Sequence, residues 1–506
     1  MTSASRRTVL RWLTGIGVVT VAPVGGFAGW LWADAARSNV GDLSFTTPLR
    51  IPPLAPAVSK GRFAKQFTLT LQRGVSELVP GKRTPTWGVN GAYLGPTVRA
   101  RRGEQVTMRV VNNLGQTTTI HWHGMHLPAA MDGGPHQPIA AGGTWSPQWT
   151  IDQPASTLWY HPHLHSVTAE HVYRGVAGLF LVDDGDTRLP HTYGVDDVPL
   201  IIQDKNFNDD GSLDSSGIKF GGINVTGLLG DTILVNGTYN PFFRVTTSLV
   251  RFRLLNGSNA RVYDVGFVDG RGFHLVGTDS GPLPAPLPLR RLMVSPGERA
   301  EIVVAFKPGE RALLRSFAPD LESNILYEQL AGGGDEMDLL RLVAAPRLAP
   351  SPPLPPALSS APPIRPAANA AVTRIVMGDF TFNDKTMDMK RVDHVATAGA
   401  VDVWEVRNDQ DIPHNFHMHG VTFQVLSLDG RQPPPHMRGF KDTVIVPPDR
   451  TVRLAVQYLR YSDPLRPYMF HCHILAHEDA GMMGQFVTVS PADRPRVPRV
   501  LGHAHG

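Results

Sequence analysis

The segment that most constrains this chain lies near its C-terminus and reads HCHILAHEDAGM, from His471 to Met482. It contains the only cysteine of the 506 residues, Cys472, with a histidine on each side and a further one at His477. A thiolate, an imidazole and a weak thioether are ligands of a blue-copper electron-transfer site, which needs a second imidazole from elsewhere. The segment therefore predicts a copper site, and the alternative is a buried free cysteine beside unrelated histidines.

The flanking histidines need a separate explanation. The residues before them, Tyr468-Met469-Phe470, are typical of the end of a strand. Because successive side chains of a strand point to opposite faces, we expect Cys472 on one face and His471 and His473 on the other. One short segment could then contribute to two metal sites, one on each side of the backbone.

Histidines recur in the same spacing elsewhere in the chain. There are 20 histidines, and four His-x-His pairs fall two in the first third and two in the last third of the sequence. The pairs are His121-Trp122-His123, His161-Pro162-His163, His417-Met418-His419 and His471-Cys472-His473, with His414 shortly before the third. In a strand each pair puts two imidazoles on one face, and neutral imidazole is a copper ligand. Eight such histidines predict a cluster of several copper ions, whereas one pair alone would be uninformative.

Internal repetition indicates three β domains. The chain has 50 Gly and 44 Pro, and its short punctuated strands favour an all-β fold. Turn sequences recur at Val89-Asn90-Gly91, Val235-Asn236-Gly237 and Phe382-Asn383-Asp384, spaced 146 and 147 residues apart. A unit of that size is one β-sandwich, and the length accommodates about three of them.

These repeats give the predicted domain bounds. Domain one covers 45–185, domain two 190–345 and domain three 369–492, with a Pro-rich linker at 346–368 and a flexible tail at 493–506. Domains one and three each carry two His-x-His pairs and domain two carries none. We therefore expect domains one and three to meet with the cluster at their interface, and domain two to be a spacer without copper.

Residues 1–38 are expected to be an export segment. Ser5-Arg6-Arg7-Thr8-Val9-Leu10 resembles a twin-arginine motif, and an uncharged stretch and the small residues Ala33-Asp34-Ala35 follow it. The segment is either cleaved or kept as a membrane anchor, since it has the ~20 residues that a spanning helix needs. Export by the twin-arginine machinery would deliver a folded protein to the periplasm, to another extracytoplasmic part of the cell envelope, or to the medium.

Charge and cysteine content narrow the function further. The net charge is +4 and no basic run interleaves with aromatic residues, so nucleic acid is not an expected partner. A single cysteine leaves no internal disulfide despite the oxidising destination, which favours a ligand role for Cys472.

The motifs together resemble a known family. HWHG, HPH, HNFHMHG and HCHILAHEDAGMM are similar, in order, to the four copper motifs of three-domain multicopper oxidases, the family of laccases, bacterial cuprous oxidases and spore-coat oxidases. The resemblance covers nearly the whole chain after the export segment. It implies an all-β fold of three cupredoxin-like Greek-key β-sandwich domains. It also implies four copper ions: one type 1, one type 2 and two type 3.

The resemblance also implies a ligand for each position. The type 1 copper would be held by His414, Cys472, His477 and the axial Met482. The type 2 copper would be held by His121 and His417. The type 3 coppers would be held by His123, His161 and His473 on one ion, and by His163, His419 and His471 on the other. Every one of these ligands is present in the chain.

The implied reaction is the four-electron reduction of O2 to water. A reduced donor would give electrons singly to the type 1 copper, and they would cross Cys472 and its neighbours to the trinuclear cluster. Asp132 and Glu478 stand where the family places acids beside the cluster, and as general acids they could relay protons. The alternatives are a turn aspartate before Gly133-Gly134 and a surface glutamate. The axial Met482 suggests a type 1 potential in the lower to middle part of the family's range.

Three functions stay open at this point. The first is a laccase-like oxidase of phenols, aromatic amines or similar small donors. The second is a cuprous (Cu(I)) oxidase serving copper tolerance, although the long Met- and His-rich insertion of copper-efflux oxidases is absent between Met377 and Asn383. The third is a non-catalytic cell-envelope protein of the same fold, against which the complete ligand set argues. A copper nitrite reductase is disfavoured by the three domains. A monomer is expected, because the cluster interface lies within one chain.

Overall fold

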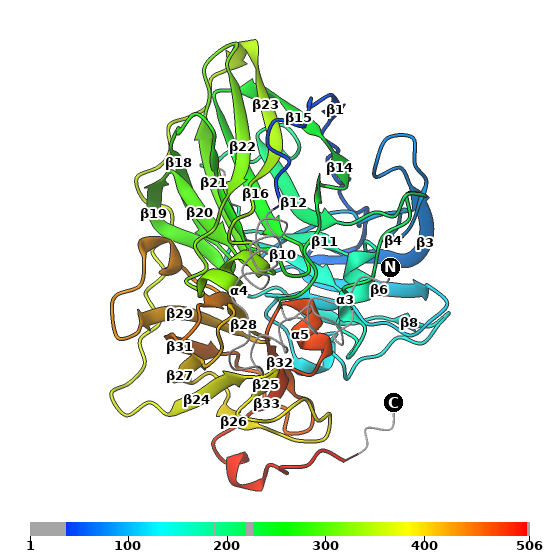
Figure 1. Cartoon of the computed structure of the whole chain (residues 1–506). Helices are drawn as coiled ribbons and strands as arrows, with labels where there is room; N and C mark the ends of the chain where they lie inside the picture. Colours follow the sequence, from blue (N-terminus) through cyan, green and yellow to red (C-terminus); the bar gives the residue numbers. More distant parts are fainter. Residues whose placement is uncertain (1–36, 186–187, 219–225, 503–506) are drawn as a thin grey trace, which may run out of the picture.

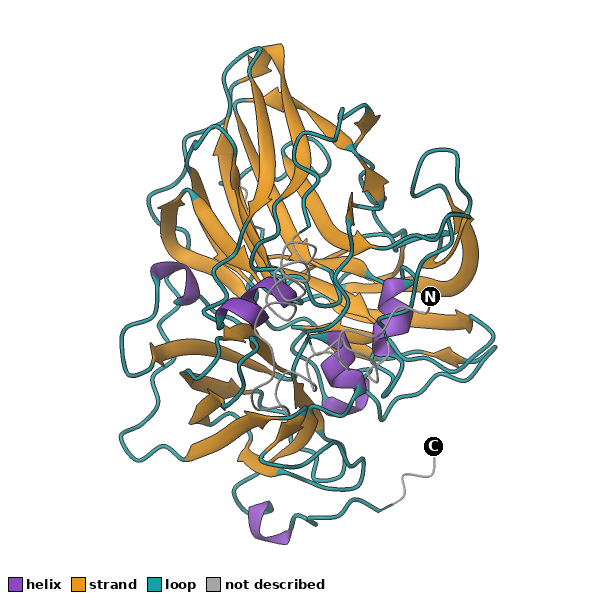
Figure 2. Ribbon diagram, viewed as in Figure 1, coloured by secondary structure: helices purple, strands orange, loops and turns teal. Residues whose placement is uncertain are grey.

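The computed structural model describes residues 37–185, 188–218 and 226–502. The twin-arginine motif and the cleavage candidate lie outside these described residues, as do 503–506 of the predicted tail. Strands make up most of the described chain and the helices are short (Figure 2). Within the described ranges, no helix is long and apolar enough to cross a membrane. The all-β prediction is confirmed.

The first pair of sheets is built from residues 57–183. One sheet runs in the order β2 (Ala57–Gly61), β3 (Ala64–Ser76), β6 (Gln105–Asn113) and β8 (Thr144–Trp145), with β4 (Thr84–Val89) beside β3 and β9 (Gln148–Thr150) beside β6. The other runs β5 (Val98–Arg101), β11 (Gly178–Asp183), β10 (Ser156–His161) and β7 (His121–His123). In β6 the residues alternate, so that Val106, Met108 and Val110 are buried between the sheets.

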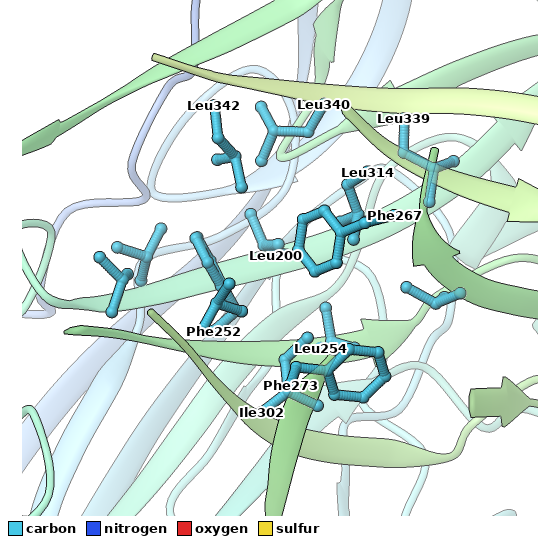
Figure 3. Close-up of a cluster of buried hydrophobic side chains, with 14 of the residues drawn as sticks. Leu200, Phe252, Leu254, Phe267, Phe273, Ile302, Leu314, Leu339, Leu340 and Leu342 are labelled. Carbon is cyan, nitrogen blue, oxygen red and sulfur yellow. The ribbon is translucent and has the colours of Figure 1, made fainter. Parts of the chain in front are cut away.

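The second pair of sheets follows in sequence. One runs β1 (Thr47–Pro48), β15 (Pro241–Thr247), β23 (Met337–Ala349), β22 (Arg311–Phe317), β17 (Tyr263–Phe267) and β20 (Arg291–Val294). The other runs β14 (Thr238–Tyr239), β13 (Thr232–Val235), β12 (Asp197–Lys205), β16 (Leu249–Asn256), β21 (Arg299–Ala305), β18 (Phe273–Thr278) and β19 (Gly281–Leu289). Figure 3 shows their shared core, with Leu200, Phe252 and Leu314 among its side chains. β12 is buried along its whole length, since Ile201 packs against the first pair of sheets.

The third pair of sheets encloses the cysteine. One runs β25 (Thr381–Phe382), β24 (Val372–Gly378), β27 (Val401–Asn408), β31 (Thr451–Tyr458) and β29 (Val421–Leu428). The other runs β26 (His394–Thr397), β33 (Met483–Val489), β32 (Tyr468–His471), β28 (His414–Met418) and β30 (Thr443–Val446). Cys472 and Met482 belong to the buried core between these sheets, with Phe416 and Trp404.

The three sandwiches surround a common junction. In Figure 1 the second (green) lies at the top, the third (yellow to red) at the bottom and the first (blue to cyan) at the right. In the described part of the chain the helices are α3 (Thr168–Tyr173), α4 (Ile325–Leu330) and α5 (Leu475–Asp479), with the 3-10 turns η1 (Ala129–Met131), η2 (Pro435–Met437) and η3 (Arg494–Arg496). α3 and α5 lie side by side, and the Asp479 carboxylate accepts the backbone N–H groups of Thr168 and Ala169 at 2.9 Å each. This contact joins the first and third sandwiches next to the histidine motifs.

Candidate metal centre

Two neighbouring strands of the first sandwich present the first two His-x-His pairs. β7 and β10 pair so that His121 lies opposite His161. Trp122, between the two histidines of β7, points into the hydrophobic core, so His121 and His123 face away from it. A strand of this pattern is stable because its apolar face is buried in its own domain while its imidazole face meets another domain.

The third sandwich repeats this arrangement. β28 pairs with β32 so that His417 lies opposite His471. Phe416 and Phe470 point into the core of this sandwich, and Cys472 follows on the core side. The sulfur and the flanking imidazoles therefore lie on opposite sides of the backbone, as expected, although β32 itself ends at His471.

The two imidazole faces pack directly against each other. We call this set the interface histidines: His121, His123, His161, His163, His417, His419, His471 and His473, all of them buried. The ring of His121 stacks on that of His419 with centroids 3.7 Å apart, and the rings of His123 and His417 stack at 3.7 Å. Each stack joins the first sandwich to the third, so imidazoles form part of the interface between them.

Ring nitrogens of the interface histidines converge in three groups whose candidate ligand atoms lie within 4.8 Å of one another. The groups are His121, His417 and His419; His121, His123 and His161; and His163, His419 and His471. The ring of His473 lies 5.0 Å from that of His123 and 5.3 Å from that of His161, centroid to centroid.

Hydrogen bonds fix which nitrogen of each ring carries the proton. Four rings donate Nδ1–H to a backbone carbonyl oxygen, which leaves Nε2 with its lone pair. These are His121 to Asp132 at 2.9 Å, His161 to Pro162 at 2.8 Å, His417 to Asp442 at 2.8 Å and His471 to Cys472 at 3.1 Å.

The free lone pairs face a common space. Nε2 of His121, His161 and His417 is buried without a hydrogen-bond partner among the described residues. Nε2 of His471 lies 3.0 Å from Nε2 of His163 and 3.2 Å from that of His419. An unpartnered buried nitrogen is costly in a protein by itself. A set of such nitrogens directed at one space suits the binding of copper ions, because imidazole binds copper in its neutral form. Burial keeps the rings in that form, because it lowers the pKa of His121, for example, well below its ordinary value.

A second group lies inside the third sandwich and contains His414, Cys472 and His477. The Sγ atom is 3.5 Å from Nδ1 of His414 and 3.6 Å from Nδ1 of His477, and the two nitrogens are 3.1 Å apart. The backbone N–H of Cys472 donates to the carbonyl oxygen of Met482 at 3.1 Å, which places that methionine beside the group. Burial raises the pKa of the Cys472 thiol to about 12, so a bound cation is needed to keep a thiolate here.

Two buried carboxyl groups border the interface histidines. Asp132 Oδ2 is 2.7 Å from Nδ1 of His419. Glu478 has Oε1 3.4 Å from Nδ1 of His163 and Oε2 3.3 Å from Nδ1 of His471. Burial raises the pKa of both carboxyl groups well above the usual range. The surface alternative for Glu478 is wrong because its side chain is fully buried, whereas Asp132 does follow the turn η1.

Other contributors to the site carry no motif. Asp442 accepts the Nε2–H of His123 at 3.1 Å, and the ring of Trp159 stacks on that of His161 at 4.0 Å. Although burial opposes its ionisation, the Arg299 guanidinium holds the pKa of Asp442 well below its usual range. Asp442, Arg299 and Trp159 lie outside the histidine motifs and belong to no spacing pattern, so only the three-dimensional structure brings these residues to the site.

Comparison with known proteins agrees with this geometry. The profile described as multicopper oxidase matches residues 70–187, and a second profile of the same description matches residues 361–492. A multicopper oxidase (mco) of Staphylococcus haemolyticus is 35% identical over 439 residues, which cover 86% of this chain and 91% of that protein. This chain belongs to the multicopper oxidase family.

Two further relatives show the breadth of the multicopper oxidase family around this chain. The crystal structure of a laccase from Pediococcus acidilactici superposes with a TM-score of 0.79 at 34% identity, over 88% of this chain and 94% of that one. The cell division protein FtsP of Salmonella typhimurium is 36% identical over 455 residues, covering 88% of this chain and 93% of that protein. Family membership implies copper binding and confirms the cupredoxin-like domains, while relatives of this similarity carry different functional names.

Proposed function

We propose that this multicopper oxidase is an exported laccase-like enzyme that oxidises small organic donors and reduces O2 to water. The observation that supports it best is the set of interface histidines, whose hydrogen bonds leave lone pairs directed into one shared space. When bound, copper would supply one-electron oxidation of the donor and four-electron reduction of O2. A protein without this chemistry would have no reason to keep so many unpartnered nitrogens buried.

The ligand sets follow the family pattern. We assign the type 1 copper to His414, Cys472, His477 and Met482, and the type 2 copper to His121 and His417. We assign one type 3 copper to His163, His419 and His471, which form one of the convergent groups. The other type 3 copper goes to His123, His161 and His473, whose rings lie 5.0–5.6 Å apart.

Two side chains are positioned to deliver protons. Asp132 and Glu478 each touch imidazoles from both the first and the third sandwich. The Nδ1–H groups of the neighbouring His121 and His471 already donate to backbone carbonyl oxygens, so the two carboxyl groups are better placed than these rings to exchange protons. These carboxyl groups can therefore hold a proton at an oxygen and pass it on through water.

The side chains around the type 1 imidazoles are mainly apolar, which supports an organic donor over Cu(I). Among the described residues, a cavity of about 10 Å³ beside His414, which is too small to hold a donor itself, is lined by residues such as Ala260, Val262 and Ile474, and its lining includes no carboxylate or sulfur. The ring of Phe380 lies 4.8 Å from that of His477. Cu(I) prefers soft sulfur ligands, which these neighbours do not offer.

A second candidate function comes from the relatives. Proteins named cell division protein FtsP are 36% identical over 88% of the chain. That name favours the alternative of a non-catalytic protein of the same fold, with a role in cell division. This candidate and the oxidase make opposite predictions about oxygen consumption.

Oxygen uptake by copper-loaded protein separates the candidates. The donors are 2,6-dimethoxyphenol and Cu(I), and the controls are copper-free protein and the Cys472→Ser variant, which lacks the soft ligand. We expect uptake with the phenol that disappears in both controls, and a higher kcat/KM for the phenol than for Cu(I). A reversed ratio would indicate a cuprous oxidase. Protein that holds about four copper ions but consumes no O2 with either donor would support the FtsP-like role instead.

Export is tested separately. We propose that the segment around Arg6 and Arg7 directs the chain through the twin-arginine machinery to an extracytoplasmic site. Replacing both arginines by lysine should retain the protein in the cytoplasm, and unchanged export would refute this route. Sequencing the N-terminus of the exported protein distinguishes cleavage from a retained anchor, and its mass in solution tests the expected monomer.

A further inference from the structure

The second sandwich contains none of the histidine motifs, but one of its side chains lies at the junction of the three sandwiches. Arg299 begins β21 and its guanidinium is buried. Its Nε–H donates to the carbonyl oxygen of Thr157 in β10 at 3.0 Å, and Nη1–H donates to Asp442 Oδ1 at 2.7 Å. Thr157 belongs to the first sandwich and Asp442 to the third, so one guanidinium joins all three.

The carboxylate that Arg299 holds orients two interface histidines. Asp442 Oδ1 accepts the Nε2–H of His123, and the backbone carbonyl of Asp442 accepts the Nδ1–H of His417. With its Nε2 occupied, His123 keeps the lone pair on Nδ1, which is buried without a partner among the described residues. Asp442 therefore determines that Nδ1 of His123, and not Nε2, faces the proposed cluster.

Arg299 also prevents Asp442 from acting as a ligand. Oxygen and nitrogen atoms of Asp442, His123 and His417 lie close enough together to hold a metal ion. The guanidinium of Arg299, however, binds both carboxylate oxygens of Asp442 in a bidentate pair. A carboxylate held in this way serves as a fixed hydrogen-bond acceptor.

The pair is itself held in place from the second sandwich. The backbone N–H of Arg299 donates to Asp279 Oδ1 at 2.8 Å. Lys441, next to Asp442 in the chain, binds Asp279 at 3.0 Å and Glu298 at 2.9 Å. Buried ion pairs of this kind add little stability compared with apolar packing. Their presence beside the histidines therefore points to positioning.

The turn before Arg299 makes a second contact with the same site. The carbonyl oxygen of Pro296 accepts an Nδ2–H of Asn415 at 2.7 Å, and Asn415 Oδ1 accepts the backbone N–H of His473 at 2.6 Å. Residues 296–299 are thus linked to two different interface histidines, through Asp442 to His123 and through Asn415 to His473.

We propose that the second sandwich positions the copper cluster, and that Arg299 is a positioning residue that acts through Asp442 to set the ring orientation of His123. This inference rests on the proposed copper site. It replaces the expectation that domain two is a passive spacer.

The test compares two substitutions of buried arginines in the second sandwich. Arg299→Lys keeps the charge but loses the bidentate fork. Arg261→Lys is the matched control, because Arg261 is equally buried and paired with Asp204 and Asp335, both in its own sandwich. Arg299→Met serves as a second variant in which the charge is removed.

The readouts are copper content per chain, the blue absorption of the Cys472 site, and the electron paramagnetic resonance spectrum of the type 2 copper. We expect Arg299→Lys to keep the blue absorption while the affinity for the cluster coppers falls by about 10–100-fold, with an altered type 2 spectrum. Its kcat should fall in the same range while the KM for the donor stays unchanged. Arg261→Lys should keep all four ions and an unaltered spectrum.

Copper-free protein gives a readout that does not depend on the oxidase proposal. Hydrogen exchange of the β7 amides should become faster in both Arg299 variants than in wild type, and should stay at the wild-type rate in Arg261→Lys. Wild-type protein that binds no copper would overturn the proposed function, while the exchange rates would still decide whether Arg299 orders β7. Equal exchange and an unaltered type 2 spectrum in Arg299→Lys and Arg299→Met would overturn the positioning role.

Discussion

The contact between the second sandwich and His473 can be probed with a single methyl group. Gly297 lies in the turn before β21 with φ +83°, and a Cβ placed there would come within 2.9 Å of Cδ2 and 3.0 Å of Cγ of His473. Normal carbon contacts are about 3.5–4.0 Å. In the Gly297→Ala variant the ring must therefore move away by about 0.6–1.1 Å, which exceeds the roughly 0.5 Å tolerance of a functional site.

Gly309 provides the matched control. It has φ +74° in the same sandwich, and a Cβ there would meet no atom within 4 Å. In both variants the left-handed backbone conformation costs an alanine about 1–2 kcal/mol of folding free energy. Alanine also restricts the unfolded chain more than glycine does, which offsets about 0.4–1 kcal/mol of that cost. Only Gly297→Ala adds an overpacking term of about 1–3 kcal/mol. The difference between the two variants therefore isolates the contact with His473.

The assay is urea unfolding of copper-free protein, followed by copper counting after reconstitution. We expect Gly297→Ala to lower the free energy of unfolding by about 1–3 kcal/mol more than Gly309→Ala. It should also bind fewer cluster coppers, with the blue absorption retained. Equal free energies of unfolding and equal copper contents in the two variants would refute the reasoning.

Three further predictions concern the same sites and one remote histidine. Cys472→Ser should abolish the blue absorption and leave about three copper ions per chain, counted by atomic absorption, because the cluster ligands are untouched. Asp132→Asn and Glu478→Gln should each lower kcat by about 10²-fold, measured by oxygen uptake. The donor should still reduce the type 1 copper at the wild-type rate in the absence of oxygen. An equal loss in oxygen uptake and in type 1 reduction would contradict a proton role. Burial, helped by nearby arginines, lowers the pKa of His394 to about 4. Because the folded state resists protonation, His394 contributes stability above its ordinary pKa of 6.5, and this stability is lost progressively as the pH falls from 6.5 to about 4. The free energy of unfolding of copper-free wild type should therefore drop by about 3 kcal/mol more than that of His394→Gln between pH 7 and pH 4.

The strand faces could be predicted from sequence because their signal is local. In His121-Trp122-His123 an aromatic residue for the core alternates with two imidazoles, and β7 has that orientation. The same holds for Phe416 and His417 in β28. Alternation with period two determines the face of each side chain without knowledge of the partner strand.

The supporting residues could not be predicted because their partners are far away in sequence. Arg299 and Asp442 are 143 positions apart and neither lies in a histidine motif. Asp479 follows Glu478 in a recognised motif, yet its role in holding α3 depends on how two domains dock. Non-local pairs of single residues leave no periodic pattern, so one sequence cannot reveal them.

The division of the interface histidines has a consequence for assembly. Four of these imidazoles come from the first sandwich and four from the third, whereas His414, Cys472 and His477 all belong to the third. One folded domain can therefore complete the group formed by His414, Cys472 and His477. The cluster can form only after the two domains have closed on each other. Metal occupancy of the proposed cluster would then report on tertiary assembly, and a wild-type chain that is blue but lacks the other ions would be one whose domains have not docked.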